Sequence, residues 1–174
     1  MEKPTPKQRI ALQMIMAHAI KPDLPKGSKP NHLIALDPGE TTGWATFYQN
    51  GLPSDTGQVS GDVVGVTDLL WGGVFEEPAD VVVFETYRIL DGKAHQFSTV
   101  PTLQVIGAIR AYAHSNNAKL VGQNPDIKSA AVKFSNVHPE GKHNNQHWVD
   151  GFNHGYFYNQ ARGIYVPRSL WPEG

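Results

Sequence analysis

Acidic residues end two apolar runs of this 174-residue chain, and each run has the length of a β-strand. Asp37 follows the apolar residues 33–36, and Glu85 follows the unbroken apolar run 81–84, which is typical of a central strand covered on both faces. Burying a charge costs free energy unless the charge is paired or holds a cation. The repeated pattern therefore predicts that both carboxylates lie at the mouths of buried strands and bind a metal ion there.

A third group of possible ligands, His147, Asp150 and His154, lies in a segment of helical character near the C-terminus. Residues three or four apart share a helix face, so these side chains should project in the same direction. Two strand-end acids and one helix acid can converge on Mg²⁺, and two such ions about 4 Å apart promote phosphodiester cleavage. Each position also has an ordinary explanation, because a strand-end acid often forms a turn or cap and a helix histidine often packs or faces solvent.

The hydrophobic pattern predicts the elements that must position these side chains. The unbroken apolar strand before Glu85 and the alternation of strands with helices indicate a single three-layer α/β domain around a mixed sheet. Strands are expected at 33–37, from 43 onward, at 55–60, 80–85 and 119–122, and helices at 63–71, 101–114, 126–134 and about 146–162.

Residues 1–30 are expected to form an appendage to this domain. Prolines bracket one helix-compatible patch at 7–20, and 21–30 has the composition of a linker. The patch is interpreted either as a short docking helix or as a solvated arm without a specific role. The main domain is predicted to span 31–165, followed by a tail at 166–174.

Composition limits the possible functions. The chain is 40% hydrophobic and 18% charged, has no apolar run long enough to cross a membrane, and begins without the apolar core of a signal peptide. It has no cysteine, so a metal must bind to Asp, Glu, His or backbone oxygen, and a cytoplasmic location is expected. The net charge of −1 argues mildly against nucleic-acid binding unless the cations cluster.

Three segments together resemble the acidic segments of RuvC-type Holliday-junction resolvases, particularly the phage-encoded relatives. They are Leu-Asp-Pro-Gly-Glu-Thr-Thr-Gly-Trp-Ala at 36–45, Val-Val-Val-Phe-Glu at 81–85 and His-Trp-Val-Asp-Gly-Phe at 147–152. The resemblance covers about residues 33–160. It implies an RNase H-like three-layer fold with a central mixed five-stranded sheet, a site for two Mg²⁺ ions that Mn²⁺ can replace, a homodimer, and branched DNA with four-way junctions as the substrate. A phage-encoded member would act in the host cytoplasm.

The resemblance also implies roles for particular residues. Asp37 would bridge both metal ions, Glu85 would bind one of them, and Asp150 would complete the site. His147 matches a position that holds Asp or His in the family, so it would be a ligand or a proton-handling residue. Lys128 lies in a Pro-x-x-Lys segment, which in the family places the lysine near the scissile phosphate. His154 has no firm counterpart and is expected either to support the site or to face solvent.

Contacts to DNA are expected from the region after Glu85 and from basic side chains elsewhere. Tyr87 or Phe97 would match the aromatic residue that wedges into the junction, and a core-packing role is equally open for either. The helix 104–110 resembles one that commonly lies at the dimer interface. A local cationic surface, or alternatively ordinary surface charge, is expected from Arg88, Lys93, His95, Lys128, Lys133, Lys142 and His143.

Two features depart from the bacterial members of the family. The segment 135–145 is shorter than its counterpart, and the N-terminal arm is additional, so a broader debranching nuclease is also consistent with the sequence. A catalytically silent DNA-binding or scaffold module and an RNase H-like nuclease acting on RNA–DNA hybrids are two further functions that the sequence leaves open. Asp-x-Gly-x-Thr at 37–41 also marks sugar-kinase and actin-like ATPases, but those enzymes need two such domains.

Overall fold

The computed structural model describes residues 28–60, 62–75, 77–87, 99–127, 130–131 and 147–166. The helix expected at 7–20 and most of the helix expected at 126–134 lie outside these residues. No helix in the described part of the chain is long and apolar enough to cross a membrane. The expected site and DNA-contact residues that also lie outside it are Arg88, Lys93, His95, Phe97, Lys128, Lys133, Lys142 and His143.

Five strands form one mixed sheet in the order β3-β2-β1-β4-β5, which confirms the expected fold class. β1 pairs antiparallel with β2 and parallel with β4; β2–β3 is antiparallel and β4–β5 is parallel. The element boundaries lie within a few residues of the sequence-based expectation. The strands are β1 (Leu33–Asp37), β2 (Thr41–Phe47), β3 (Pro53–Ser60), β4 (Val81–Glu85) and β5 (Lys119–Gln123), and the helices are α2 (Asp62–Trp71), α3 (Thr99–Ser115) and α5 (His147–Ala161).

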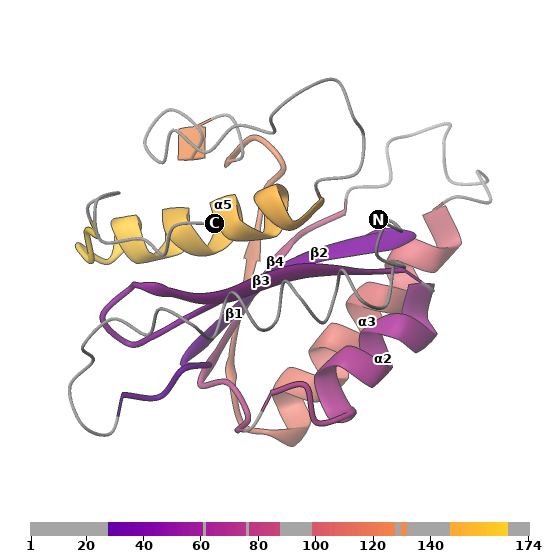
Figure 1. Ribbon diagram of the computed structural model, residues 1–174. Helices are drawn as coiled ribbons and strands as arrows, with labels where there is room; N and C mark the ends of the chain where they lie inside the picture. Colours follow the sequence, from indigo (N-terminus) through magenta and orange to yellow (C-terminus); the bar gives the residue numbers. More distant parts are fainter. Residues whose placement is uncertain are drawn as a thin grey trace, which may run out of the picture.

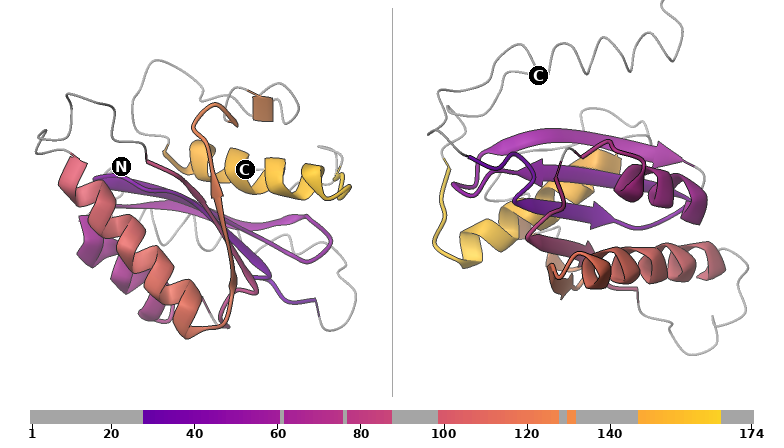
Figure 2. Two further views of the ribbon diagram at one scale, coloured as in Figure 1. Left: turned by 180° about the vertical axis from the view of Figure 1, so that it is seen from behind. Right: turned by 90° about the horizontal axis from the view of Figure 1, so that it is seen from below.

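Helices cover both faces of the sheet, as Figure 1 shows: α5 lies on one face, and α2 and α3 lie on the other. The views in Figure 2 show α2 and α3 side by side. Alternation along β1 separates two cores, because Leu33 and Ala35 pack under α5 whereas Ile34 and Leu36 pack with α2 and α3. The apolar run of β4 is buried on both faces, as its unbroken hydrophobicity predicted.

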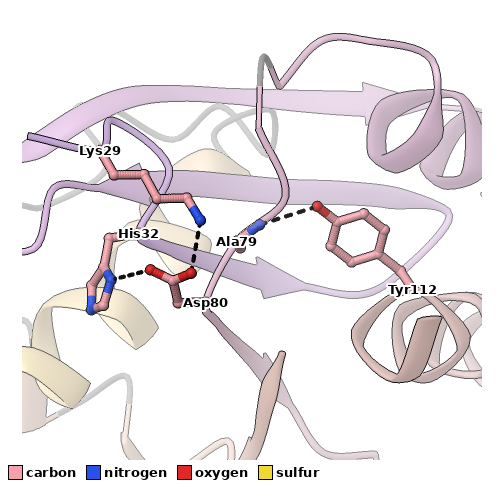
Figure 3. Close-up of polar contacts among 5 residues, drawn as sticks. All are labelled: Lys29, His32, Ala79, Asp80 and Tyr112. Carbon is pink, nitrogen blue, oxygen red and sulfur yellow. Dashed lines mark hydrogen bonds and ion pairs between the residues drawn. The ribbon is translucent and has the colours of Figure 1, made fainter. Parts of the chain in front are cut away.

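A cluster of polar contacts joins the start of β4 to the segment that leads into β1 (Figure 3). Lys29 Nζ donates to Asp80 Oδ1 at 2.7 Å, and His32 Nδ1 lies 2.8 Å from Asp80 Oδ2. Nearby, the Ala79 N–H donates to the buried Tyr112 hydroxyl of α3. The hydrogen bond from Lys29 is the largest cause that lowers the pKa of Asp80, and partial desolvation opposes it.

This cluster should make a small, pH-dependent contribution to stability. A lowered pKa in the folded state stabilises above the unfolded value of 3.8, and the contribution is lost as the pH falls through the folded pKa. At pH 7, Asp80→Asn should lower the free energy of unfolding by less than about 1 kcal/mol, because solvent screens the pair. In urea titrations, the difference from wild type should shrink as the pH falls below 3.8 and vanish below the lower pKa of the folded state. The control is Asp68→Asn, which removes an exposed carboxylate of α2. It should leave the free energy of unfolding at pH 7 unchanged.

Candidate metal centre

The strand register places the two strand-end acids side by side. Leu36 pairs with Phe84 across the parallel β1–β4 ladder, so Asp37 and Glu85 follow as neighbours at the same edge of the sheet. Gln123 of β5 pairs with Glu85 on the next strand. Ala35, Val83 and Val121 pack under α5. Asp37, Glu85 and Gln123 each lie two residues further along the same strands, so their side chains point to the same face of the sheet.

Three side chains converge at this edge. One ligand atom each from Asp37, Glu85 and His154 lie within 4.8 Å of one another. Both carboxylates are partly exposed, whereas His154 is fully buried. Two carboxylates and one imidazole are a donor set that divalent cations accept, and the exposure of the acids leaves a route for an ion to enter. The residues therefore fit the metal ion that the sequence predicted.

His154 reaches the site from the middle of α5. Its Nε2 lies 3.0 Å from Glu85 Oε2, and its Nδ1 lies 2.7 Å from Gln123 Oε1. The alternative expectation that His154 faces solvent is wrong, because its side chain is fully buried and contacts Glu85 and Gln123 at the ends of β4 and β5. Gln123 was not anticipated from the sequence. Only the pairing of β4 with β5 shows that it lies beside Glu85 on the neighbouring strand.

Hydrogen bonds from Thr86 hold the end of β5 against the end of β4. The Thr86 N–H donates to the Gln123 carbonyl oxygen at 2.7 Å, and the Thr86 hydroxyl donates to the same oxygen at 2.9 Å. These contacts continue the strand pairing one residue beyond Glu85. They fix the backbone from which Gln123 meets His154.

The Asp-Pro-Gly turn after β1 is closed by a buried threonine. Thr42 Oγ1 lies 3.3 Å from both the amide nitrogen and the carbonyl oxygen of Gly39, accepting from the first and donating to the second. Thr42 is fully buried, so this hydroxyl has an internal role in the turn. The turn fixes Asp37 at the mouth of its strand, which gives a physical reason for the Thr-Thr-Gly that follows the Pro-Gly pair.

The first turn of α5 lies directly on Gly43, the β2 partner of Asp37. A Cβ atom on Gly43 would clash with the His147 carbonyl group, and one on Gly151 would lie 2.8 Å from the Gly43 carbonyl oxygen. Backbone contact at these glycines therefore brings the start of α5 to the edge of the sheet where the acids lie. The sequence analysis did not identify Gly43 and Gly151 as contact points. Both lie near expected ligands in the sequence, since Gly151 directly follows Asp150 and Gly43 lies in the segment after Asp37.

His147 and Asp150 lie on α5, but the group that includes Asp37, Glu85 and His154 contains neither of them. Asp150 is four residues before His154, so it lies on the same helix face one turn nearer the N-terminus. Both residues are partly exposed, and their roles as ligands stay predictions. Tyr87, two residues after Glu85, is 42% exposed, which places an accessible aromatic ring beside this edge of the sheet.

Comparison with protein-family models gives no match, and comparison with curated protein sequences gives none either. Solved structures do match. RuvC of Thermus thermophilus in complex with a Holliday junction substrate has a TM-score of 0.56 and 10% identity, covering 76% of this chain and 96% of that one. A second T. thermophilus RuvC structure covers the same shares with a TM-score of 0.52 and 10% identity.

A weaker similarity is to the yeast mitochondrial Holliday junction resolvase Ydc2, with a TM-score of 0.48, 13% identity and 88% of each chain covered. The fold assignment rests on the two RuvC structures and on the sheet order. The chain thus has the RNase H-like fold of RuvC, a mixed five-stranded sheet with helices on both faces.

Proposed function

We propose that this chain is a divalent-metal-dependent endonuclease that cleaves branched DNA and resolves Holliday junctions. The observation that carries the proposal is the convergence of Asp37 and Glu85 at the ends of adjacent parallel strands in a RuvC fold. One of the similar structures is a RuvC bound to a Holliday junction substrate, which makes a four-way junction the first substrate to test.

In this proposal, Asp37 and Glu85 hold Mg²⁺ or Mn²⁺ at the edge of the sheet. When bound, a pair of such ions supplies an activated water and stabilises the leaving oxygen, which yields 5′-phosphate and 3′-hydroxyl ends. Asp150 and His147 complete the site from the first turn of α5, which contacts Gly43 next to Asp37. The Thr42–Gly39 contacts keep the Asp37 carboxylate in place while the substrate binds.

DNA contacts are proposed on the same edge of the sheet. Tyr87 is exposed two residues beyond Glu85, where its ring can stack on an unpaired base at the branch point. Lys128 is proposed to lie near the scissile phosphate, and basic side chains around the site would supply contacts to the DNA backbone. These contacts, which would make binding salt-dependent, are proposed for Arg88, Lys93, Lys128 and Lys133.

A homodimer is also proposed, because resolving a four-way junction requires cuts in two strands. Helix α3, whose counterpart commonly lies at the dimer interface in the family that the sequence resembles, exposes 40% of Leu103 on its outer face. An apolar side chain there is available for contact with a second copy. Light scattering should then give twice the 19.1 kDa chain mass at assay concentrations.

The test of the nuclease proposal is cleavage of a labelled synthetic four-way junction in Mg²⁺ or Mn²⁺. We expect cuts near the branch point, products with 5′-phosphate ends, and little cutting of a linear duplex of the same arms. Equal cleavage of three-way junctions and flaps would indicate a broader debranching enzyme. Preference for an RNA–DNA hybrid, or junction binding without cleavage in either ion, would contradict the proposal.

A further inference from the structure

Both ring nitrogens of His154 face oxygen atoms that can accept a hydrogen bond. Gln123 Oε1 is 2.7 Å from Nδ1, and Glu85 Oε2 is 3.0 Å from Nε2. A neutral imidazole has one N–H group and one lone pair, so it can donate to only one of these oxygens. If Nδ1–H donates to Gln123, the Nε2 lone pair faces the Glu85 carboxylate, and either a second ring proton or a bound metal ion between the two atoms would make this arrangement favourable.

The distances at this site suit an ion. Ligand atoms about 2.1 Å from an octahedral cation lie about 3.0 Å apart when they are neighbours in the coordination shell. The 3.0 Å separation of His154 Nε2 from Glu85 Oε2 equals that spacing, and the Asp37 carboxylate completes a group within 4.8 Å. Metal-binding histidines usually donate their other N–H to a fixed acceptor, which is the position that Gln123 occupies.

We propose that His154 Nε2 is a ligand of the ion held by Asp37 and Glu85, with Gln123 fixing the Nδ1–H form of the ring. The inference rests on the proposed metal site and gives a definite role to His154, which the sequence pattern left open between supporting the site and facing solvent. Mg²⁺ prefers an all-oxygen shell that includes water, whereas first-row transition ions accept imidazole. This ion position therefore favours Mn²⁺ over Mg²⁺.

A competing explanation assigns His154 a positioning role only. In that arrangement the Gln123 side-chain amide is turned over, its NH₂ donates to Nδ1, and Nε2–H donates to Glu85 Oε2. Glu85 would then be oriented by His154 and bind the ion alone. The two arrangements differ in whether a nitrogen atom touches the metal, which is measurable without any DNA or cleavage.

The experiment is Mn²⁺ binding by the full chain, followed by pulsed electron paramagnetic resonance, which detects ¹⁴N nuclei bound to the ion. Wild-type protein should show imidazole nitrogen modulation. His154→Gln should lose it and bind Mn²⁺ about 10–100-fold more weakly, while its affinity for Mg²⁺ changes about threefold or less. His114→Gln, a change to an exposed histidine at the end of α3, should leave both readouts as in wild type.

The possible outcomes separate this inference from the nuclease proposal. If the wild-type protein binds Mn²⁺ and cleaves junctions but its spectrum shows no nitrogen modulation, the ligand role of His154 is overturned. The nuclease proposal then still stands. Modulation that persists in His154→Gln but disappears in His147→Gln would assign the nitrogen to His147 and also overturn it. Absence of Mn²⁺ and Mg²⁺ binding would remove the metal site itself, and both proposals with it.

His154 is fully buried, so the variant is first compared with wild type by circular dichroism. A measurement on unsubstituted protein covers the case in which the variant fails to fold. With ring-¹⁵N-labelled histidine and one equivalent of the diamagnetic ion Zn²⁺, Nε2 of His154 should lose its proton and shift to the range of metal-bound nitrogen. An Nε2 that remains protonated in the Zn²⁺-loaded protein would contradict the ligand assignment.

Discussion

Asp37→Asn should leave a folded protein that binds four-way junctions but cleaves them about 1,000-fold more slowly or worse. The substitution keeps the size of the side chain and removes the charge that both proposed ions share. A ligand of this kind contributes several kcal/mol to the stabilisation of the transition state, and each 1.4 kcal/mol or so is a factor of ten in rate. Single-turnover cleavage of a labelled junction, with the protein in excess, measures the effect.

Stability measurements show whether a loss of cleavage reflects the site or the fold. Asp37 and Glu85 each contribute a carboxylate oxygen to a group within 4.8 Å, so without metal their charges repel. Asp37→Asn should therefore melt at or above the temperature of the metal-free wild type. A metal concentration of 100 times the dissociation constant should raise the free energy of unfolding of the wild type by about 2.7 kcal/mol. Asp37→Asn should lose most of this gain.

Glu77→Gln is the matched control, because it also removes one negative charge and lies in the exposed segment that leads into the opposite end of β4. It should cleave at the wild-type rate and keep the stabilisation by metal. If Asp37→Asn cleaves as fast as Glu77→Gln, Asp37 is not a metal ligand and the proposed function fails. If it loses junction binding as well as cleavage, the effect is not confined to the chemical step.

The sequence was sufficient for the strands and their acids because both signals are local. Asp37 and Glu85 each end an apolar run, and burial of β1 and β4 in the centre of the sheet follows from that hydrophobicity. Strand order and register cannot be read from such runs. They place Gln123 beside Glu85 and Gly43 beside Asp37, and these neighbours were therefore missed.

The orientation of α5 was predicted less well for a physical reason. Aromatic and apolar side chains occur around most of this helix, and residues 151–156 are buried without a break, so hydrophobicity does not distinguish the face toward the sheet. Helical spacing grouped His147, Asp150 and His154, whereas contact with the sheet is made at Gly151 and Gly155. That contact brings His154 to Glu85, which helical spacing alone could not show.

The glycine contact leads to the prediction with the largest effect on stability. Gly43→Ala should lower the free energy of unfolding by about 3 kcal/mol, as overpacking of a closely packed contact does. The added Cβ would meet the His147 carbonyl group and would lie 2.7 Å from the Trp148 amide nitrogen, and neither backbone atom can move away without shifting the start of α5. Chemical denaturation of the metal-free protein measures the loss.

Gly107→Ala is the control, because the same change in α3 meets no atom within 4 Å and should stabilise the helix by about 0.5–1 kcal/mol. Gly151→Ala tests the same contact from the helix side, since its Cβ would lie 2.8 Å from the Gly43 carbonyl oxygen. Because the two clashes share one helix displacement, the double variant should lose less stability than the sum of the single losses. Fully additive losses, or wild-type stability of Gly43→Ala, would show that α5 does not rest on β2 beside Asp37.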